Sequence, residues 1–147
     1  PRLLKSVYLA EGALAARNRL LMEKYAAMQA EACAECWNTD DAELVVVAFG
    51  SMARIARSAI RKLREEGLKA GLFRPKTLYP FPADALRALA PGRRFLVIEQ
   101  NTGQMVEDVR LSLMGENARV DWHGVMPGLF IGADALEDPI RQACKEN

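Results

Sequence analysis

The chain alternates short, continuous apolar runs with longer stretches of helical periodicity. The first run, residues 44–49, ends at Gly50-Ser51, and a second run at 70–73 follows a helical stretch. A third run, 95–98, stops at the polar segment 99–104. Continuous apolar runs joined by helical patterns are typical of parallel strands that helices bury on both faces. We therefore predict an α/β fold, a three-layer α/β/α sandwich with a mostly parallel sheet.

Helical patterns connect the predicted strands. After Gly50, apolar residues recur every three or four positions as far as Gly67, and Ser51 is the predicted N-cap of this helix. Residues 83–90 and 104–114 predict two shorter helices. These connections are long enough to cross over a sheet and return in parallel.

The C-terminal third is less regular. The short, polar run 119–122 predicts a fourth strand near a sheet edge, and the glycine-rich apolar segment 124–132 predicts a packed loop. Residues 133–145 predict a last helix. Because Pro139 lies inside its pattern, we expect this helix to begin late, near Asp138.

Residues 11–37 predict one long helix ahead of the α/β core. Its apolar positions recur at spacings of three, four or seven, which places them on one stripe: Leu14, Leu21, Tyr25, Met28, Ala32 and Cys36. This stripe must pack on the core or on another chain. We divide the chain into a lead-in segment with this helix, 1–39, and an α/β domain, 40–147; residues 1–10 are apolar without a clear element.

Composition narrows the function classes. The 147 residues are enough for about one domain with a sound core, and 20 basic residues balance 19 acidic ones for a net charge of +1. This balance gives no reason to expect nucleic acid or an anionic membrane as a partner. No apolar run approaches the ~20 residues needed to span a bilayer, and the chain start lacks the apolar core of a signal peptide. We expect a cytoplasmic protein.

Three cysteines raise the question of metal or redox chemistry. Cys33 and Cys36 have the C-x-x-C spacing, but they lie in the predicted helix, and no second Cys/His pair completes a zinc site. With Cys144, only three thiolates are available for an iron–sulfur cluster, which usually needs four. We interpret the pair as two small helix residues one turn apart and predict no metal site.

The candidate site lies where the predicted parallel strands end. Ligands and partners of such sheets gather beyond the carboxyl ends of the strands. The segments that follow the three buried strands should share that edge. They supply the candidate interface or site-supporting residues Gly50, Ser51, Arg74, Thr77, Glu99, Asn101, Gly103 and Gln104.

The charged and amide candidates each allow two interpretations. Glu99 and Asn101 either position a polar group, with Gly103 and the free N–H groups of the next helix receiving an anion, or hydrogen-bond the turn and neighbouring loops. Arg74 either binds a carboxylate or phosphate or pairs with Glu99. The single histidine, His123, is typical of a surface or turn residue. We predict no catalytic residue in the chain.

Three segments, taken in order, resemble a known family: Leu-Val-Val-Val-Ala-Phe-Gly-Ser at 44–51, Arg-Pro-Lys-Thr-Leu-Tyr-Pro-Phe-Pro at 74–82, and Glu-Gln-Asn-Thr-Gly-Gln-Met-Val-Glu-Asp-Val-Arg at 99–110. Together they are similar to the C-terminal domain of the alpha subunit of 2-oxoacid:ferredoxin oxidoreductases, over residues 40–128. The resemblance implies the fold of the transketolase C-terminal domain. It also implies a complex that oxidatively decarboxylates a 2-oxoacid to acyl-coenzyme A and passes electrons to ferredoxin.

In that family, thiamine diphosphate with Mg²⁺ and the iron–sulfur clusters are held by other domains and subunits. The resemblance therefore implies no cofactor in this chain, and as partners the beta subunit, other subunits and, through the complex, ferredoxin. It implies a role in subunit assembly and active-site support. Two alternatives remain: a free-standing flavodoxin-like module that binds an anion or nucleotide at the same edge, and the corresponding domain of a transketolase or an oxoacid dehydrogenase beta subunit.

Overall fold

The structure, a computed structural model, describes residues 7–145. Helix α1 (Ala13–Met28) and a 3₁₀ turn (Gln29–Glu31) precede strand β1 (Ala34–Trp37). The prediction of one helix over 11–37 is thus correct to about residue 31 and wrong beyond it. β1 pairs with the edge of the sheet, and its Trp37 packs against the core, so that tertiary pairing overrides local helix propensity. Cys36 is therefore a strand residue.

Five strands form one sheet in the order β1-β3-β2-β4-β5. All neighbours run parallel except β1, which is antiparallel to β3. The other strands are β2 (Leu44–Val47), β3 (Ala70–Pro75), β4 (Arg94–Glu99) and β5 (Val120–Gly124). The prediction of a mostly parallel sheet with a fourth strand at its edge is confirmed.

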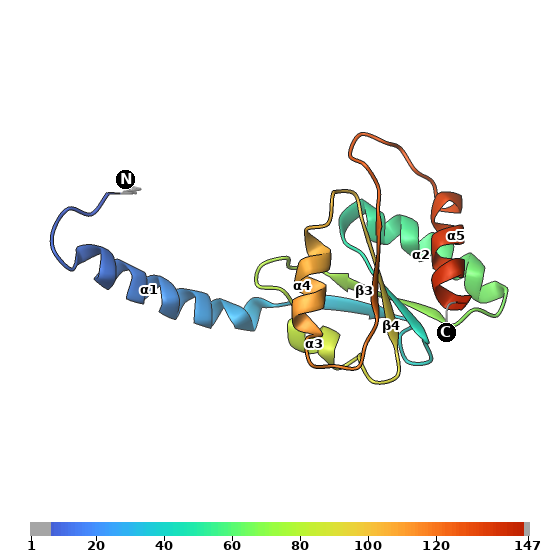
Figure 1. The fold of residues 1–147 in the computed structure, drawn as a ribbon, viewed down its shortest axis with the longest axis horizontal. Helices are drawn as coiled ribbons and strands as arrows, with labels where there is room; N and C mark the ends of the chain where they lie inside the picture. The colour runs from blue at the N-terminus through green and yellow to red at the C-terminus, as the bar shows by residue number, and fades with distance from the viewer. Residues whose placement is uncertain (1–6, 146–147) are drawn as a thin grey trace.

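Four helices cover the two faces of the sheet, as Figure 1 shows. They are α2 (Gly50–Glu65), α3 (Ala83–Arg87), α4 (Met105–Ser112) and α5 (Asp134–Lys145). α2 and α5 pack on one face, and α3 and α4 on the other. The three-layer α/β/α sandwich is confirmed.

Alternation along the strands divides the core into two halves. Leu44, Val46 and Ala48 face α2 and α5, whereas Val45 and Val47 face α3 and α4. All four residues of β2 are fully buried, because this central strand has helices on both sides.

α1 extends away from the sandwich (Figure 1). None of its sixteen residues is buried by the described part of the chain. Near its end, the Tyr25 ring meets the Tyr79 ring edge-on with centroids 6.1 Å apart. The stripe thus does not lie along the core, which was one of its two expected partners.

Two helix starts differ from prediction. Ser51 is not an N-cap, because α2 begins at Gly50 with φ +58° after an extended Phe49, and no described side chain caps it. α5 begins at Asp134 and not near Asp138, and Pro139 lies inside it. Leu136 is fully buried in the core, and this packing holds the first turn of α5 although the proline removes one hydrogen bond.

The segment 124–132, predicted to be a packed loop, is mostly exposed in the structure. Only Val125 is buried, and the next five residues are exposed. The lead segment 1–10 lies partly outside the described residues. The domain division at residue 40 remains a prediction, and β1, which precedes it, belongs to the same sheet.

Gly71 has a packing role in β3. A Cβ atom on this glycine would lie 2.5 Å from the carbonyl oxygen of Asn38, which itself has φ +51°. The turn after β1 therefore crosses directly over β3, and only glycine leaves space for it.

Candidate site at the carboxyl edge of the sheet

The strand register places the candidate segments on one edge. Val47, Phe73 and Val97 lie side by side in three adjacent parallel strands. The segments that follow them therefore leave the sheet together. Because β1 is antiparallel, its first residue, Ala34, opposes Pro75 at this same edge, so α1 also joins the core there.

Two of the candidate residues, Arg74 and Glu99, lie on opposite faces of the sheet. Arg74 lies two residues after Leu72 and therefore on the same face of the sheet, which α2 covers. Glu99 lies two residues after Val97 and therefore on the opposite face, which α4 covers. The possible Arg74–Glu99 pair is therefore wrong. The Arg74 guanidinium lies 3.3 Å from Glu35, the residue directly opposite on β1, and Arg57 of α2 lies 3.5 Å from the same carboxylate.

Arg57 also stacks on an aromatic ring. Its guanidinium carbon lies 4.9 Å from the centre of the Trp37 ring. Arg57, Glu35 and Arg74 thus tie α2, β1 and β3 together on one face of the edge. The sequence around Glu35 gave no signal of this cluster, because residues 34–37 were predicted as part of a helix.

Glu99 is the centre of the other face. Its side chain is fully buried, and one carboxylate oxygen accepts a hydrogen bond from the Met105 N–H at 2.8 Å. The other oxygen accepts from the Val106 N–H at 3.1 Å and from the indole Nε1–H of Trp122 at 3.0 Å. A buried carboxylate is satisfied here by three donors, two of them at the positive end of α4.

The turn before α4 is closed by Asn101. Its side-chain oxygen accepts from the N–H groups of Gly103 at 2.8 Å and Gln104 at 3.3 Å. Gly103 adopts φ +104°, which favours glycine. Of the two interpretations, the geometry matches hydrogen bonding of the turn and its neighbours; Gln104 itself is exposed.

Trp122 was missed at this site. Its ring lies against two glycine backbones: a Cβ on Gly124 would clash with it, and one on Gly103 would be in ordinary contact. The indole N–H binds Glu99 while the residue remains 43% exposed. The signal in the sequence is a tryptophan with a glycine two positions later on an edge strand, which predicts close ring–backbone packing only once β4 is known to be its neighbour.

Thr77 fastens the loop after β3 to the start of β1. Its hydroxyl oxygen accepts from the Cys33 N–H at 2.9 Å, and the N–H groups of Lys76 and Thr77 donate to the Cys33 carbonyl. Cys36 lies within the extended strand β1 and Cys33 directly precedes it, and both are exposed free cysteines. Partial burial raises the pKa of the Cys36 thiol.

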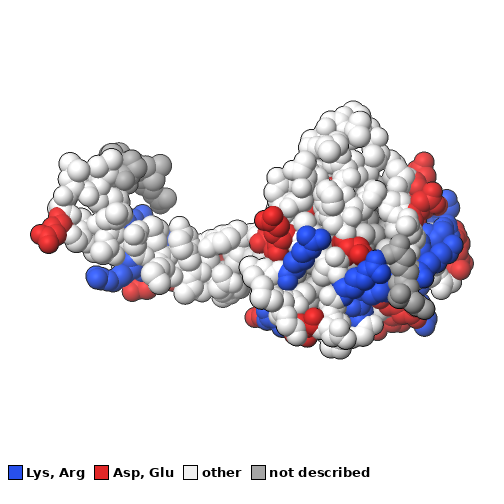
Figure 2. All heavy atoms as spheres, in the orientation of Figure 1, with Lys and Arg blue, Asp and Glu red and all other residues white. Residues whose placement is uncertain are grey.

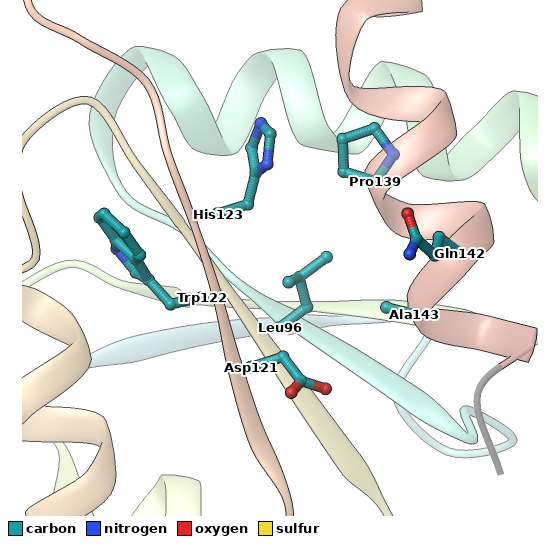
Figure 3. A pocket seen from close by; sticks show the side chains of 7 residues that line it. All are labelled: Leu96, Asp121, Trp122, His123, Pro139, Gln142 and Ala143. Atoms are coloured by element: carbon teal, nitrogen blue, oxygen red, sulfur yellow. The ribbon is translucent and has the colours of Figure 1, made fainter.

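His123 lines a hollow of about 240 Å³ between β5 and α5. Figure 3 shows His123, Leu96, Pro139 and Gln142 around this hollow, with the Trp122 ring turned to the other side. Burial lowers the pKa of His123. His123 belongs to strand β5 and is only partly exposed, so it is not a turn residue.

The described residues offer little to the cofactors that the resemblance implies. Among residues 7–145, no three His, Cys, Asp or Glu side chains gather to hold a metal ion. At the start of α4, where a diphosphate would find backbone N–H groups, the Glu99 carboxylate already accepts them. The α4 side of the edge therefore does not fit a diphosphate.

The fold and edge define an α/β/α domain whose polar edge residues hold loops and strands together. The family model described as "Pyruvate:ferredoxin oxidoreductase core domain II" matches residues 42–130. The chain belongs to this family, as domain II of a 2-oxoacid:ferredoxin oxidoreductase alpha subunit. This confirms the family resemblance of the sequence motifs.

Curated relatives agree. Ketoisovalerate oxidoreductase subunit VorB of Methanothermobacter thermautotrophicus is 46% identical over 112 residues, which are 75% of this chain and 32% of that protein. Pyruvate synthase subunit PorA of Pyrococcus horikoshii is 32% identical over 118 residues, 74% of this chain and 30% of that protein. The chain spans about a third of the length of these relatives.

Solved structures share the fold. The 2-oxoglutarate:ferredoxin oxidoreductase from Magnetococcus marinus, with 2-oxoglutarate, coenzyme A and succinyl-CoA bound, superposes with a TM-score of 0.77 at 19% identity, over 95% of this chain and 25% of that one. A split-gene transketolase, an inactive beta4 tetramer, superposes with a TM-score of 0.61 at 20% identity, over 71% of this chain and 39% of that one. The transketolase-like fold is confirmed.

No helix among residues 7–145 combines the length and the apolar character required to cross a membrane.

Proposed function

We propose that this chain works as a non-catalytic domain of an oxidoreductase complex that uses thiamine diphosphate to convert a 2-oxoacid and coenzyme A to acyl-coenzyme A, with ferredoxin as electron acceptor. The observation that carries the proposal is the match of core domain II to residues 42–130. Relatives named for ketoisovalerate, 2-oxoglutarate and pyruvate support a 2-oxoacid as the substrate class.

In this proposal the carboxyl edge supports assembly and the active site through structure. Two of its charged groups are engaged within the domain: Glu99 with α4 and Trp122, and Arg74 with Glu35. Such an edge presents a fixed surface to a partner. Thiamine diphosphate, Mg²⁺ and iron–sulfur clusters belong to other parts of the complex, and the partners are its beta and other subunits.

The test uses the full alpha subunit that carries this chain, purified with its partner subunits. We expect reduction of ferredoxin, or of a viologen dye, that requires coenzyme A and one of the three oxoacids. The chain of 147 residues alone should give none. An assembled, cofactor-loaded complex that is inactive with pyruvate, 2-oxoglutarate and branched-chain oxoacids would contradict the proposal.

The supporting role of the edge is tested with Asn101→Ala. Loss of its two hydrogen bonds should loosen the turn before α4 and lower turnover or subunit association by about threefold to tenfold, while the domain stays folded. Asn117→Ala is the matched control, because Asn117 is an exposed asparagine in the turn after α4. Wild-type turnover and assembly in Asn101→Ala would remove the edge from the proposal.

A further inference from the structure

An uncharged apolar loop, residues 126–130, projects from the carboxyl edge. The sequence from Trp122 to Ala133 contains no Asp, Glu, Lys or Arg. Within the loop, Met126 is 62% exposed, Leu129 58% and Phe130 fully exposed. On the face that Figure 2 shows, this lobe of the molecule lacks charge, whereas Lys, Arg, Asp and Glu gather on the lower part of the sandwich and on the side where α5 lies. An exposed cluster of large apolar side chains marks an interaction surface.

The loop is held at both ends by the core. Before it, Val125 is buried, and its N–H donates to the Glu99 carbonyl at 2.9 Å. After it, Ile131 packs against the same core half as α2 and α5. In the middle, the Gln100 side-chain amide donates to the Leu129 carbonyl at 2.7 Å. The exposed side chains are therefore presented on a fixed backbone.

Three consecutive residues hold this arrangement. The Glu99 side chain hydrogen-bonds α4 and Trp122, and its backbone carbonyl accepts from Val125 at the base of the loop. The Gln100 side chain donates to Leu129 in the middle of the loop. The Asn101 side chain closes the turn before α4. The segment 99–101 thus positions the apolar loop relative to the sheet. A surface that is ordered before binding loses less entropy when it binds.

We propose that the apolar loop is a docking element whose Phe130 inserts into an apolar pocket on another folded domain of the oxidoreductase complex, and that residues 99–101 position it. Large aromatic side chains at the centre of an interface commonly contribute most of the binding energy. This inference rests on the proposed function for the identity of its partner.

The chemistry around the loop selects a protein as the partner. The nearest charged residues in sequence on either side are both acidic, Asp121 and Asp134. Asp121 is ion-paired with Arg119 at 2.9 Å, so the base of the loop carries no unpaired cluster of Lys or Arg, and nothing in residues 122–133 would attract an anionic lipid surface or nucleic acid. The relatives are about three times as long as the matched region, and the 2-oxoglutarate:ferredoxin oxidoreductase chain is about four times as long, so proteins of this kind carry further chain that can supply such a surface.

The position of the loop in the complex is tested by photocrosslinking. A benzoyl-phenylalanine at position 130 of the full alpha subunit, assembled with its partner subunits, should crosslink to apolar residues of another domain, identified by mass spectrometry. Crosslinks only to a second copy of this same domain, or none, would overturn the assignment.

Its contribution to binding is tested with Phe130→Ser, which should weaken association in the complex by about tenfold or more. Leu111→Ser is the matched control, because Leu111 is an apolar residue that is 64% exposed on α4, outside the loop. Equal losses in the two variants, or none in Phe130→Ser, would contradict the docking role.

The positioning role is tested separately with Gln100→Ala. Amide hydrogen exchange at residues 126–130 should become faster while the thermal midpoint of the domain is kept, and unchanged exchange would refute it. Association and exchange are measured without turnover. A complex that shows Phe130-dependent association but no oxoacid oxidation would refute the proposed function and leave the docking element in place.

Discussion

At the scale of single residues, Glu99 shows how a polar motif can serve the fold. A carboxylate at the end of a buried strand, just before a helix, suggests a ligand site. Here it supplies the anion that the start of α4 attracts, and it binds the Trp122 indole with the same group. The edge residue that looked most suited to a ligand is thus enclosed by the protein.

Replacement of Glu99 should therefore reduce stability. Glu99→Ala leaves two buried backbone N–H groups and one indole N–H without their acceptor, and we expect a loss of about 2–4 kcal/mol in the free energy of unfolding. Glu99→Gln, which keeps one acceptor oxygen, should lose about 1–2 kcal/mol. Urea unfolding followed by Trp122 emission in a Trp37→Phe background measures both, and wild-type stability in Glu99→Ala would contradict the assignment.

His123 makes stability depend on pH. Burial holds the folded pKa of His123 below its ordinary value of 6.5, so the folded state favours the neutral ring. The contribution of this group is present above about pH 6.5 and is lost as pH falls through the folded pKa, because the unfolded chain binds the proton more readily.

We expect the thermal midpoint of the wild-type domain to fall when the pH is lowered from 7 to 5. The midpoint of His123→Gln should fall less over the same range. Asp108 does not mask this difference: burial and the charges of Glu107 and Glu99 raise its folded pKa, so its contribution has the opposite sign and is the same in both proteins. Identical falls in the two proteins would show that His123 does not contribute.

At the scale of elements, the N-terminal segment divides into two parts with different roles. β1 completes the sheet, since it pairs with β3 over four residues and brings Trp37 to the core. α1 has no buried residue in the described chain and touches the core mainly through Tyr25. An isolated helix of this length is marginal in water, so its stability depends on a partner surface.

Truncation separates the two parts. Removal of residues 1–28 should leave the thermal midpoint within about 2 °C, because none of the described residues in this range, 7–28, is buried. Removal of residues 1–37 should lower it by about 5 °C or more, because the β3 edge, the Trp37 packing and the Glu35 ion pairs are lost. Circular dichroism melts of the two variants measure this, and equal effects would contradict the division.

At the scale of the whole molecule, the carboxyl edge has two independent sides. The cluster of Glu35, Arg57 and Arg74 lies on the α2 face, and the cluster of Glu99, Asn101 and Trp122 lies on the α4 face. The sheet between them is the buried core. Substitutions on the two faces should therefore act additively on stability, as do those at distant sites in general.

The sequence alone determined the sandwich, its parallel strands and its family. Continuous apolar runs have no exposed face, so they specify strands covered on both sides, and the ordered motifs at 44–51, 74–82 and 99–110 specify the family. The common edge of Gly50, Arg74 and Glu99 also followed, because parallel strands end together.

Only the tertiary structure decided what those edge residues do. Helix propensity along 32–37 was overruled by pairing with β3, and strand alternation placed Arg74 and Glu99 on opposite faces. Trp122 became a partner of Glu99 because β5 lies next to β4, although 23 positions separate them in the chain. The apolar content of residues 124–132 predicted a packed loop, but the backbone path leaves residues 126–130 exposed, because hydrophobic composition does not say which surface will cover a segment.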